Sequence, residues 1–153
     1  MTSIDELLKP SLSDAGSTPT PIYSTTAGFA TAFFGGPFAA VALTAVNSGR
    51  LRRLAADAPM LLALAAVSLL IIAFCANPAL FGQPDFRLGN VGMRLVGRGA
   101  GLGVFSVSWL MHRRYYRSMQ VIGIEPPKGW IAGLACIVFG ALSSLALIGL
   151  VAK

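Results

Sequence analysis

The sequence contains few charged residues for its length. Of its 153 residues, 12% are Asp, Glu, Lys or Arg, whereas 55% are hydrophobic. A soluble domain usually has about 25% charged residues, so this chain has too few polar groups to cover a surface in water. We therefore expect a membrane protein whose main partner is the lipid bilayer. The length leaves room for one folded unit and no second domain.

Groups that carry out chemistry are also scarce. The single histidine, His112, follows an apolar run and is expected at the membrane interface, and Cys75 and Cys136 lack the C-x-x-C spacing of a metal or redox site. None of the six carboxylates falls inside an apolar run; they are Asp5, Glu6, Asp14, Asp57, Asp85 and Glu125. No acid pair, activated nucleophile or metal-ligand cluster can be assembled. We therefore predict a non-enzymatic protein without a cofactor or a metal.

The positions of the positive charges exclude a nucleic-acid partner. The net charge is +6, but the basic residues sit between hydrophobic runs and form no single polar face. Charges in such positions set the orientation in a membrane. The loops after the first and third runs carry seven of them, against three to five on the other side; the seven are Arg50, Arg52, Arg53, Arg113, Arg114, Arg117 and Lys128. This predicts cytoplasmic loops and both termini outside.

Four apolar runs are long enough to cross a bilayer, which takes roughly 20 residues. They cover about residues 24–46, 58–80, 91–111 and 130–151. Asp57 stands just before the second run and is predicted to cap it. The predicted fold class is therefore all-α, a bundle of four transmembrane helices within residues 22–153. Residues 1–21 are rich in Ser, Thr and Pro and are predicted to be a disordered tail.

The first run has small residues at every fourth position and Gly-Gly-Pro at its centre. Small residues let helices pack closely in lipid, and we expect such packing around Gly28, Ala32, Gly36 and Ala40. A step of four residues turns about 400°, so only three or four consecutive members can face one partner. Gly35, Gly36 and Pro37 predict a bend, because Pro37 has no N–H to donate. A functional hinge, or a carbonyl exposed to a ligand, is the alternative interpretation.

The third run combines glycines with two arginines. Its G-R-G-A-G-L-G stretch lacks the glycine spacing of a dinucleotide fingerprint. It contains the pairs Gly97 with Gly101 and Gly99 with Gly103, which predict close helix packing. Arg94 and Arg98 lie one turn apart near the outer end of the run. They either extend to the headgroups or contact an anionic lipid or a partner protein.

The first run also carries a motif that resembles a known family. A Tyr-Ser pair is followed by Phe-x-Gly-Gly-Pro-x-Ala, then Leu and Asn; the residues are Tyr23, Ser24, Phe33, Gly35, Gly36, Pro37, Ala39, Leu43 and Asn47. In this the chain resembles an uncharacterised family of small, multi-span bacterial inner-membrane proteins. The resemblance implies a location in a bacterial inner membrane and implies no activity.

Two functional hypotheses follow from the sequence. The first is an accessory or assembly subunit that packs through its small-residue helix faces against itself or another membrane protein. The alternative is an oligomeric channel or carrier for a small or anionic solute, with Pro37 at a hinge and Arg98 beside the path.

Overall fold

The computed structural model describes residues 21–83, 89–123, 125–127 and 129–151. Its elements are α2 (Thr25–Arg50), α3 (Leu54–Ala76), the short 3-10 helix η1 (Pro78–Phe81), α4 (Asn90–Ile122) and α5 (Trp130–Val151). Over these residues the structure is helical without strands, which confirms the all-α part of the predicted fold class. The predicted disordered tail, residues 1–21, lies outside the described residues apart from Pro21.

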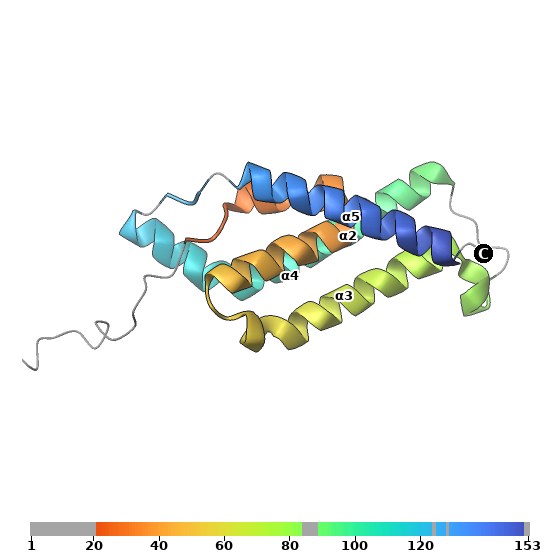
Figure 1. Cartoon of the computed structure of the whole chain (residues 1–153), viewed down its shortest axis with the longest axis horizontal. Coiled ribbons are helices and arrows are strands. Elements are labelled where there is room, and N and C mark those ends of the chain that lie inside the picture. Colours follow the sequence, from red (N-terminus) through yellow and green to blue (C-terminus); the bar gives the residue numbers. More distant parts are fainter. Residues whose placement is uncertain (1–20, 84–88, 124, 128, 152–153) are drawn as a thin grey trace, which may run out of the picture.

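The α2 segment is a hairpin of two antiparallel arms. Gly36 interrupts the helix with φ 71° and ψ −165°, a conformation that is essentially restricted to glycine. Just before the first arm, Tyr23 donates its backbone N–H to Asn47 Oδ1 at 3.0 Å, although the two residues are 24 positions apart. An unbroken helix would separate them by about 36 Å. The chain therefore reverses at Gly36, and Figure 1 shows the two arms, residues 25–35 and 37–50, running in opposite directions.

This reversal corrects the predicted first span, 24–46, which is not a single crossing helix. Each arm has 11 to 14 residues by its bounds and is about 16–21 Å long. The hydrocarbon core of a bilayer is about 30 Å thick. Neither arm is therefore long enough to cross it alone. The bend predicted from Gly-Gly-Pro is a full reversal because Gly36 leaves the helical conformation, whereas Pro37 keeps it at the start of the second arm.

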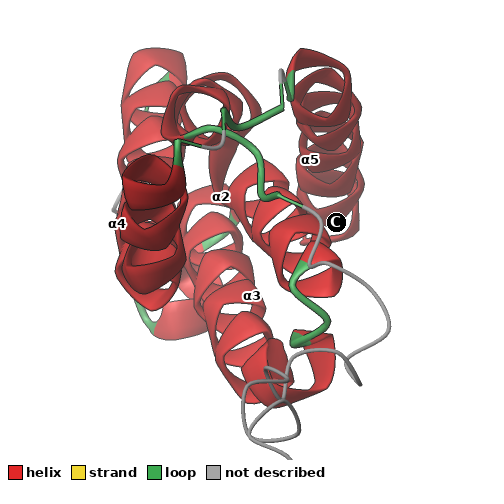
Figure 2. Ribbon diagram, turned by 90° about the vertical axis from the view of Figure 1, so that its left-hand side faces the viewer, coloured by secondary structure: helices red, strands yellow, loops and turns green. Residues whose placement is uncertain are grey.

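The hairpin lies between α4 and α5, with α3 beside them (Figure 2). Its second arm forms the core, in which Ala40 packs with Leu64 of α3 and Val104 of α4. On the other side of the same arm, two apolar residues pack against Cys136 of α5; they are Ala39 and Leu43. The deepest packing of the bundle is thus built around α2.

The row of small residues on α2 faces α4 along both arms. In the first arm a Cβ on Gly28 would lie 2.9 Å from the Phe105 ring. In the second arm Thr44 contacts Ser108 of α4. One turn further along both helices, Ser48 contacts His112. The prediction that only three or four members share one partner was wrong. It assumed an unbroken helix, whereas the reversal at Gly36 returns the row to the same neighbour.

The helix boundaries follow from local chemistry. α3 starts at Leu54, so Asp57 lies in its first turn and does not cap it as predicted. α3 ends at Ala76, two residues before Pro78, because a proline disfavours helical backbone in the preceding residue. α4 is longer than the predicted 91–111 and ends at Ile122. The next residue, Gly123, has the left-handed conformation common after a helix. α5 has the predicted bounds, 130–151.

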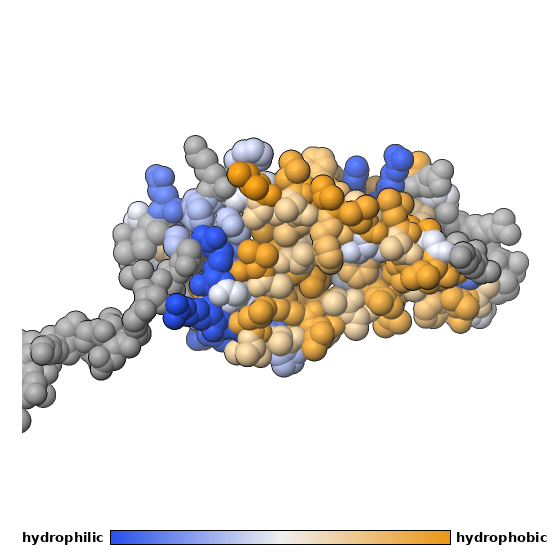
Figure 3. Space-filling view, in the orientation of Figure 1, coloured by the Kyte–Doolittle hydropathy of each residue, from blue (hydrophilic) through white to orange (hydrophobic). Residues whose placement is uncertain are grey.

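Three helices are long and apolar enough to cross a membrane, namely α2, α3 and α5. The predicted count of four spans is not confirmed, and α2 meets the criterion of length only when its two arms are counted together. An apolar band covers the middle of the bundle, and hydrophilic residues gather mainly at one end (Figure 3). The described residues therefore form a helical bundle suited to a membrane.

The two ends of the described chain lie at opposite ends of this bundle. Pro21 is beside Arg50, whose Nε donates to the Pro21 carbonyl at 2.8 Å. Val151 is beside Asn77, whose side-chain amide donates to the Val151 carbonyl at 3.0 Å. The two termini themselves lie outside the described residues, so the prediction that both are outside the membrane stays a prediction. That prediction took residues 24–46 as one crossing, whereas the hairpin returns the chain from its tip to the end of the bundle where Tyr23 lies.

Candidate functional site

Glycines of both neighbouring helices hold the tip of the hairpin. On α4, a Cβ at Gly101 would overlap the Ala32 carbonyl oxygen and lie 3.0 Å from the Gly36 carbonyl carbon. On α5, a Cβ at Gly140 would lie 2.6 Å from the Gly35 carbonyl oxygen. Backbone therefore touches backbone on two sides, the kind of contact that stabilises helix pairs in lipid. Since Gly140 lies at the middle of α5, the tip reaches the middle of the bundle.

Some of the other residues selected from the sequence pack in or beside the hairpin, and the rest face open space. Pro37 and Ala40 are buried in the hairpin. Gly97 faces the tip, because its carbonyl oxygen lies 3.8 Å from the position of a Cβ on Gly36. Gly99 and Gly103 have open space where a Cβ would point. Gly97 also has open space at its own Cβ position, so of the two predicted glycine pairs on α4 only Gly101 packs tightly against the hairpin.

A cleft of about 690 Å³ opens beside the hairpin tip. We call it the tip cleft. Residues 33–37 of the hairpin form one wall. The other walls are α4 around residues 93–98, and apolar faces of α3 and α5 that contribute Ile71, Ile72, Cys75, Ala141, Ser144, Leu145 and Ile148. Its volume lies within the range of small-molecule sites, roughly 300–1,000 Å³.

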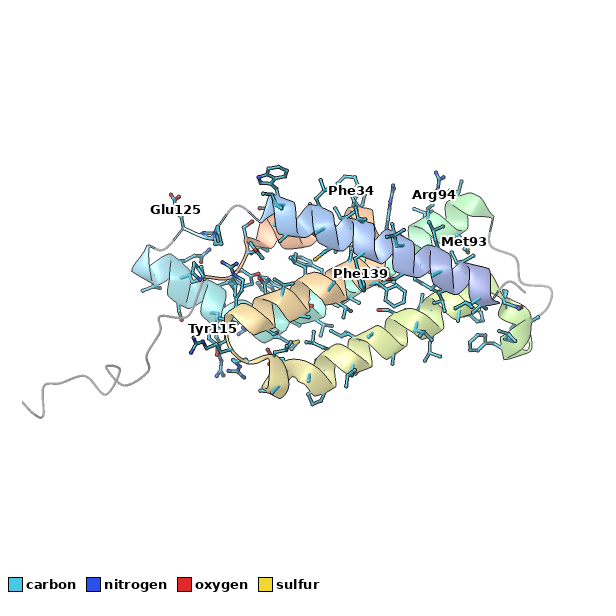
Figure 4. The ribbon with its side chains drawn as sticks, viewed as in Figure 1. Phe34, Met93, Arg94, Tyr115, Glu125 and Phe139 are labelled. Carbon is cyan, nitrogen blue, oxygen red and sulfur yellow. The ribbon has the colours of Figure 1, made fainter. Side chains whose placement is uncertain are left out.

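Arg94 and Arg98 give the tip cleft its charge. Both line the cleft from one face of α4, and both are exposed. The Arg98 guanidinium lies 4.8 Å from the centre of the Phe33 ring, a cation–π contact. Figure 4 shows Phe34 and Arg94 on the same side of the bundle. No acidic residue is found among the described lining residues, so the described part of the walls carries two positive charges and no negative one.

This combination determines which ligands the tip cleft suits. One guanidinium group can donate two parallel hydrogen bonds to two oxygens of the same phosphate or carboxylate. The other walls are mostly aliphatic or aromatic, which suits a hydrocarbon chain. An anionic amphiphile fits both parts, with its charged group at Arg94 and Arg98 and its chain along α3 and α5.

The open ends of the two hairpin arms are joined by polar contacts, which we call the hairpin base. Besides bonding to Asn47, Tyr23 accepts a hydrogen bond at its carbonyl from the Tyr116 hydroxyl at 3.1 Å. Arg50 donates to the Tyr23 hydroxyl at 3.1 Å and stacks 4.4 Å from the centre of the same ring. Ser24 caps the first arm by accepting from the Ala27 N–H. The ends of the sequence motif, Tyr23 and Asn47, therefore meet here.

A buried polar row joins the second arm to α4. Thr44 donates to the Ser108 hydroxyl at 2.7 Å, and one turn further Ser48 Oγ lies 3.3 Å from His112 Nε2. Asp57 of α3 completes the row, with Oδ2 at 3.5 Å from the same nitrogen. His112 is only 3% exposed, so its side chain is packed inside the bundle, while its predicted depth at the membrane interface stays a prediction. On α2, Thr44 and Ser48 are four residues apart, and on α4 so are Ser108 and His112. This shared spacing was the signal in the sequence that could have revealed the row.

Ser48, His112 and Asp57 are the residue types of a hydrolase triad, but their arrangement differs. In a triad the serine and the carboxylate bind opposite nitrogens of the ring. Here both lie at Nε2, and Nδ1 lies 3.1 Å from the Ser108 carbonyl oxygen of its own helix. The carboxylate therefore cannot orient the ring as a base toward the serine, and the cluster does not match this kind of nucleophile.

Among the described residues no group of three or more His, Cys, Asp or Glu side chains is arranged to hold a metal ion. Comparisons with protein-family models, curated proteins and solved structures gave no match to this chain.

Proposed function

We propose that this chain is a non-enzymatic integral membrane protein that binds an anionic amphiphile in the tip cleft. The observation that carries the proposal is the pair Arg94 and Arg98, which lie in an otherwise largely apolar cleft without an acidic residue among its described walls. Charged residues within membrane-spanning segments are costly and usually serve a partner or ligand. Arg98 lies about 6 Å deeper along α4 than Arg94. It is therefore expected to contribute more to binding.

The proposal includes a topology. α3, α4 and α5 cross the inner membrane of a bacterium, and the hairpin enters from one side and returns to it. The arginine-rich segment before α3 and the arginine-rich last part of α4 meet at one end of the bundle, where Arg53 donates to the Tyr115 hydroxyl at 2.6 Å. By the positive-inside rule this end is cytoplasmic. Residue 21 then lies on the cytoplasmic side, and the tip cleft opens toward the outer leaflet.

An accessory role based on small-residue faces has less support than the sequence suggested. The close contacts of Gly28, Gly101 and Gly140 are all within the chain. Gly28 of the hairpin contacts α4, whereas Gly101 of α4 and Gly140 of α5 contact the hairpin. The faces of these three glycines are consequently not free to pack against another protein, and the open face of Gly99 and Gly103 on α4 remains for such a contact. A ligand site at the tip cleft explains more of the arrangement, because it uses both the arginines and the reversal at Gly36.

Protection of Cys75 tests the proposal at the site itself. Cys75 lines the tip cleft, and Cys136 can be replaced by alanine so that one thiol remains. We expect phosphatidylglycerol to slow the reaction of Cys75 with a maleimide, and phosphatidylcholine with the same chains to have little effect. In Arg94→Gln/Arg98→Gln the concentration needed for protection should rise at least about tenfold, which corresponds to about 1.4 kcal/mol.

Two controls show whether the protecting anion is a lipid or a free ion, and whether it binds at the tip cleft or at other arginines. Arg113→Gln/Arg114→Gln removes two exposed arginines at the other end of the bundle and should keep the protection of the parent. Glycerol phosphate protects Cys75 only if a free anion, and not a lipid, is the ligand. Equal protection by both lipids, or by phosphatidylglycerol in all variants, would contradict the proposed site.

A carrier or channel for small anions is the second candidate. The hairpin favours it, because non-helical backbone at membrane depth is tolerated where protein buries it or where it lines a water-filled cavity. Broken helices that meet near the middle of the membrane form substrate sites in transporters. Anion flux into liposomes that is lost in Arg98→Gln would favour this candidate, whereas lipid protection of Cys75 without flux would favour the first.

A further inference from the structure

His112 is buried at a position where its two ring nitrogens have different surroundings. Nδ1 lies 3.1 Å from the Ser108 carbonyl oxygen. A carbonyl can only accept a hydrogen bond, so Nδ1 carries a hydrogen whether the ring is neutral or charged. Nε2 faces the Ser48 hydroxyl and the Asp57 carboxylate. The nitrogen that gains or loses a proton is therefore Nε2.

Asp57 has an oxygen that lacks a hydrogen-bond donor. Oδ2 is buried and has no hydrogen-bond partner among the described residues, while Oδ1 lies 3.9 Å from Arg53 Nε. A buried acceptor without a donor is costly, and more so when it is charged. The atom nearest to it in the polar row is His112 Nε2 at 3.5 Å. A proton on Nε2 would supply the missing donor.

The charged groups around His112 leave Asp57 as the carboxylate that faces the ring. From α2, Arg50 is engaged with Tyr23. From the loop before α3, Arg53 stacks on and bonds to Tyr115. α5 has no charged residue, and Cys136 is its sole titratable group. The other described basic residues at this end are exposed; they are Arg52, Arg113, Arg114 and Arg117.

The state of Nε2 determines which helix His112 holds. When the ring is neutral, the Ser48 hydroxyl donates to Nε2 and ties the second hairpin arm to α4. When Nε2 is protonated it becomes a donor, and a carboxylate is a stronger acceptor than a hydroxyl. The hydrogen bond then passes to Asp57, and Ser48 loses its acceptor. Binding of one proton thus moves the hydrogen bond of His112 from Ser48 of the hairpin to Asp57 of α3.

We propose that His112 and Asp57 form a buried proton-binding site that controls how firmly the hairpin base is held to α4. The site lies away from the tip cleft, and it does not depend on the ligand proposed above. Proton uptake at Nε2 loosens the second arm from residue 44 onward, and proton release restores the bond to Ser48.

The chain contains one histidine, so ¹⁵N-labelled histidine reports on this site alone. We expect the NMR spectrum of the full chain in nanodiscs to show the neutral ring with its hydrogen on Nδ1, and a second hydrogen on Nε2 at lower pH. At the pH where half of the parent rings are charged, Asp57→Asn should lower the ratio of charged to neutral ring about tenfold. Ser48→Ala should raise that ratio, because it removes the donor that favours the neutral form.

Two exposed residues of the same end provide matched controls, Glu125→Gln for the carboxylate and Ser118→Ala for the hydroxyl. Both should leave the ratio unchanged. Protection factors for amide hydrogen exchange in residues 44–50, which are corrected for the intrinsic effect of pH on exchange, should fall as the ring becomes charged. Ser48→Ala should abolish this fall. A neutral ring with its hydrogen on Nε2, or shifts in the same direction in Asp57→Asn and Ser48→Ala, would overturn the proposal.

Discussion

Gly101→Ala is expected to lower the free energy of unfolding by about 3 kcal/mol, the upper part of the usual range for overpacking a tight site. The added methyl group would overlap the Ala32 carbonyl oxygen and lie 3.1 Å from the Gly36 Cα. Both obstacles are backbone atoms of the hairpin and cannot move aside as the end of a side chain could. The hairpin must therefore separate from α4 or the chain must fail to fold.

Gly103→Ala is the matched control for this prediction. It lies half a turn further along α4, and its added methyl group would meet no atom within 4 Å. Because alanine favours helices over glycine, Gly103→Ala should leave the stability unchanged or raise it by up to about 1 kcal/mol. Denaturation of both variants in the same detergent provides the comparison. Equal effects would mean that the Gly101 face of α4 does not touch the hairpin.

Gly36→Asn should be the second large effect, for a different physical reason. A Cβ at Gly36 has only the Gly97 carbonyl oxygen nearby, at 3.8 Å, so crowding costs little. The cost comes from the backbone, because φ 71° with ψ −165° is a region populated essentially by glycine. We expect a loss of about 2–3 kcal/mol and, in part of the protein, a hairpin that does not form.

Gly123→Asn separates backbone strain from the general effect of adding a side chain. Gly123 has nearly the same φ, 72°, but its ψ of 20° falls in the left-handed helical region. Asparagine adopts that region readily. Gly123→Asn should therefore cost less than about 1 kcal/mol. If thermal denaturation in detergent shows equal losses for the two variants, Gly36 is not the point at which the chain reverses.

The sequence revealed the positions of the helices better than the path of the first one. The apolar run at 130–151 coincides with α5, because an uninterrupted hydrophobic stretch has one obvious conformation in lipid. Gly35, Gly36 and Pro37 do not determine an angle in the same way. Glycine and proline allow a mild kink or a complete reversal, and the choice depends on contacts with Gly101 and Gly140, which lie far along the chain.

The sites show the same division between local and distant information. Arg94 and Arg98 stand out in the sequence because charge is rare in an apolar run, and the structure places both in one cleft. His112 could not be interpreted in this way. Its partners, Ser48 and Asp57, come from two other helices, and the reversal at Gly36 is what brings the second arm alongside α4.

The motif that resembles the bacterial family acquires a physical interpretation from the hairpin. Tyr23 and Asn47 bond to each other at its base, and Ser24 caps its first arm. The Gly-Gly-Pro stretch forms its tip. Each of these residue types meets a requirement of a helix that reverses, and none of them needs a catalytic role.

The distance between the outer ends of the two arms tests the central claim, that the chain reverses at Gly36. Spin labels can be placed at Thr25 and Gly49, which are exposed, in a variant with Cys75→Ser and Cys136→Ala. Double electron–electron resonance then measures the distance between the two spin labels in nanodiscs. The hairpin predicts a main distance below about 20 Å, whereas an unbroken helix would separate these positions by about 36 Å. A single distance near the longer value would contradict the account.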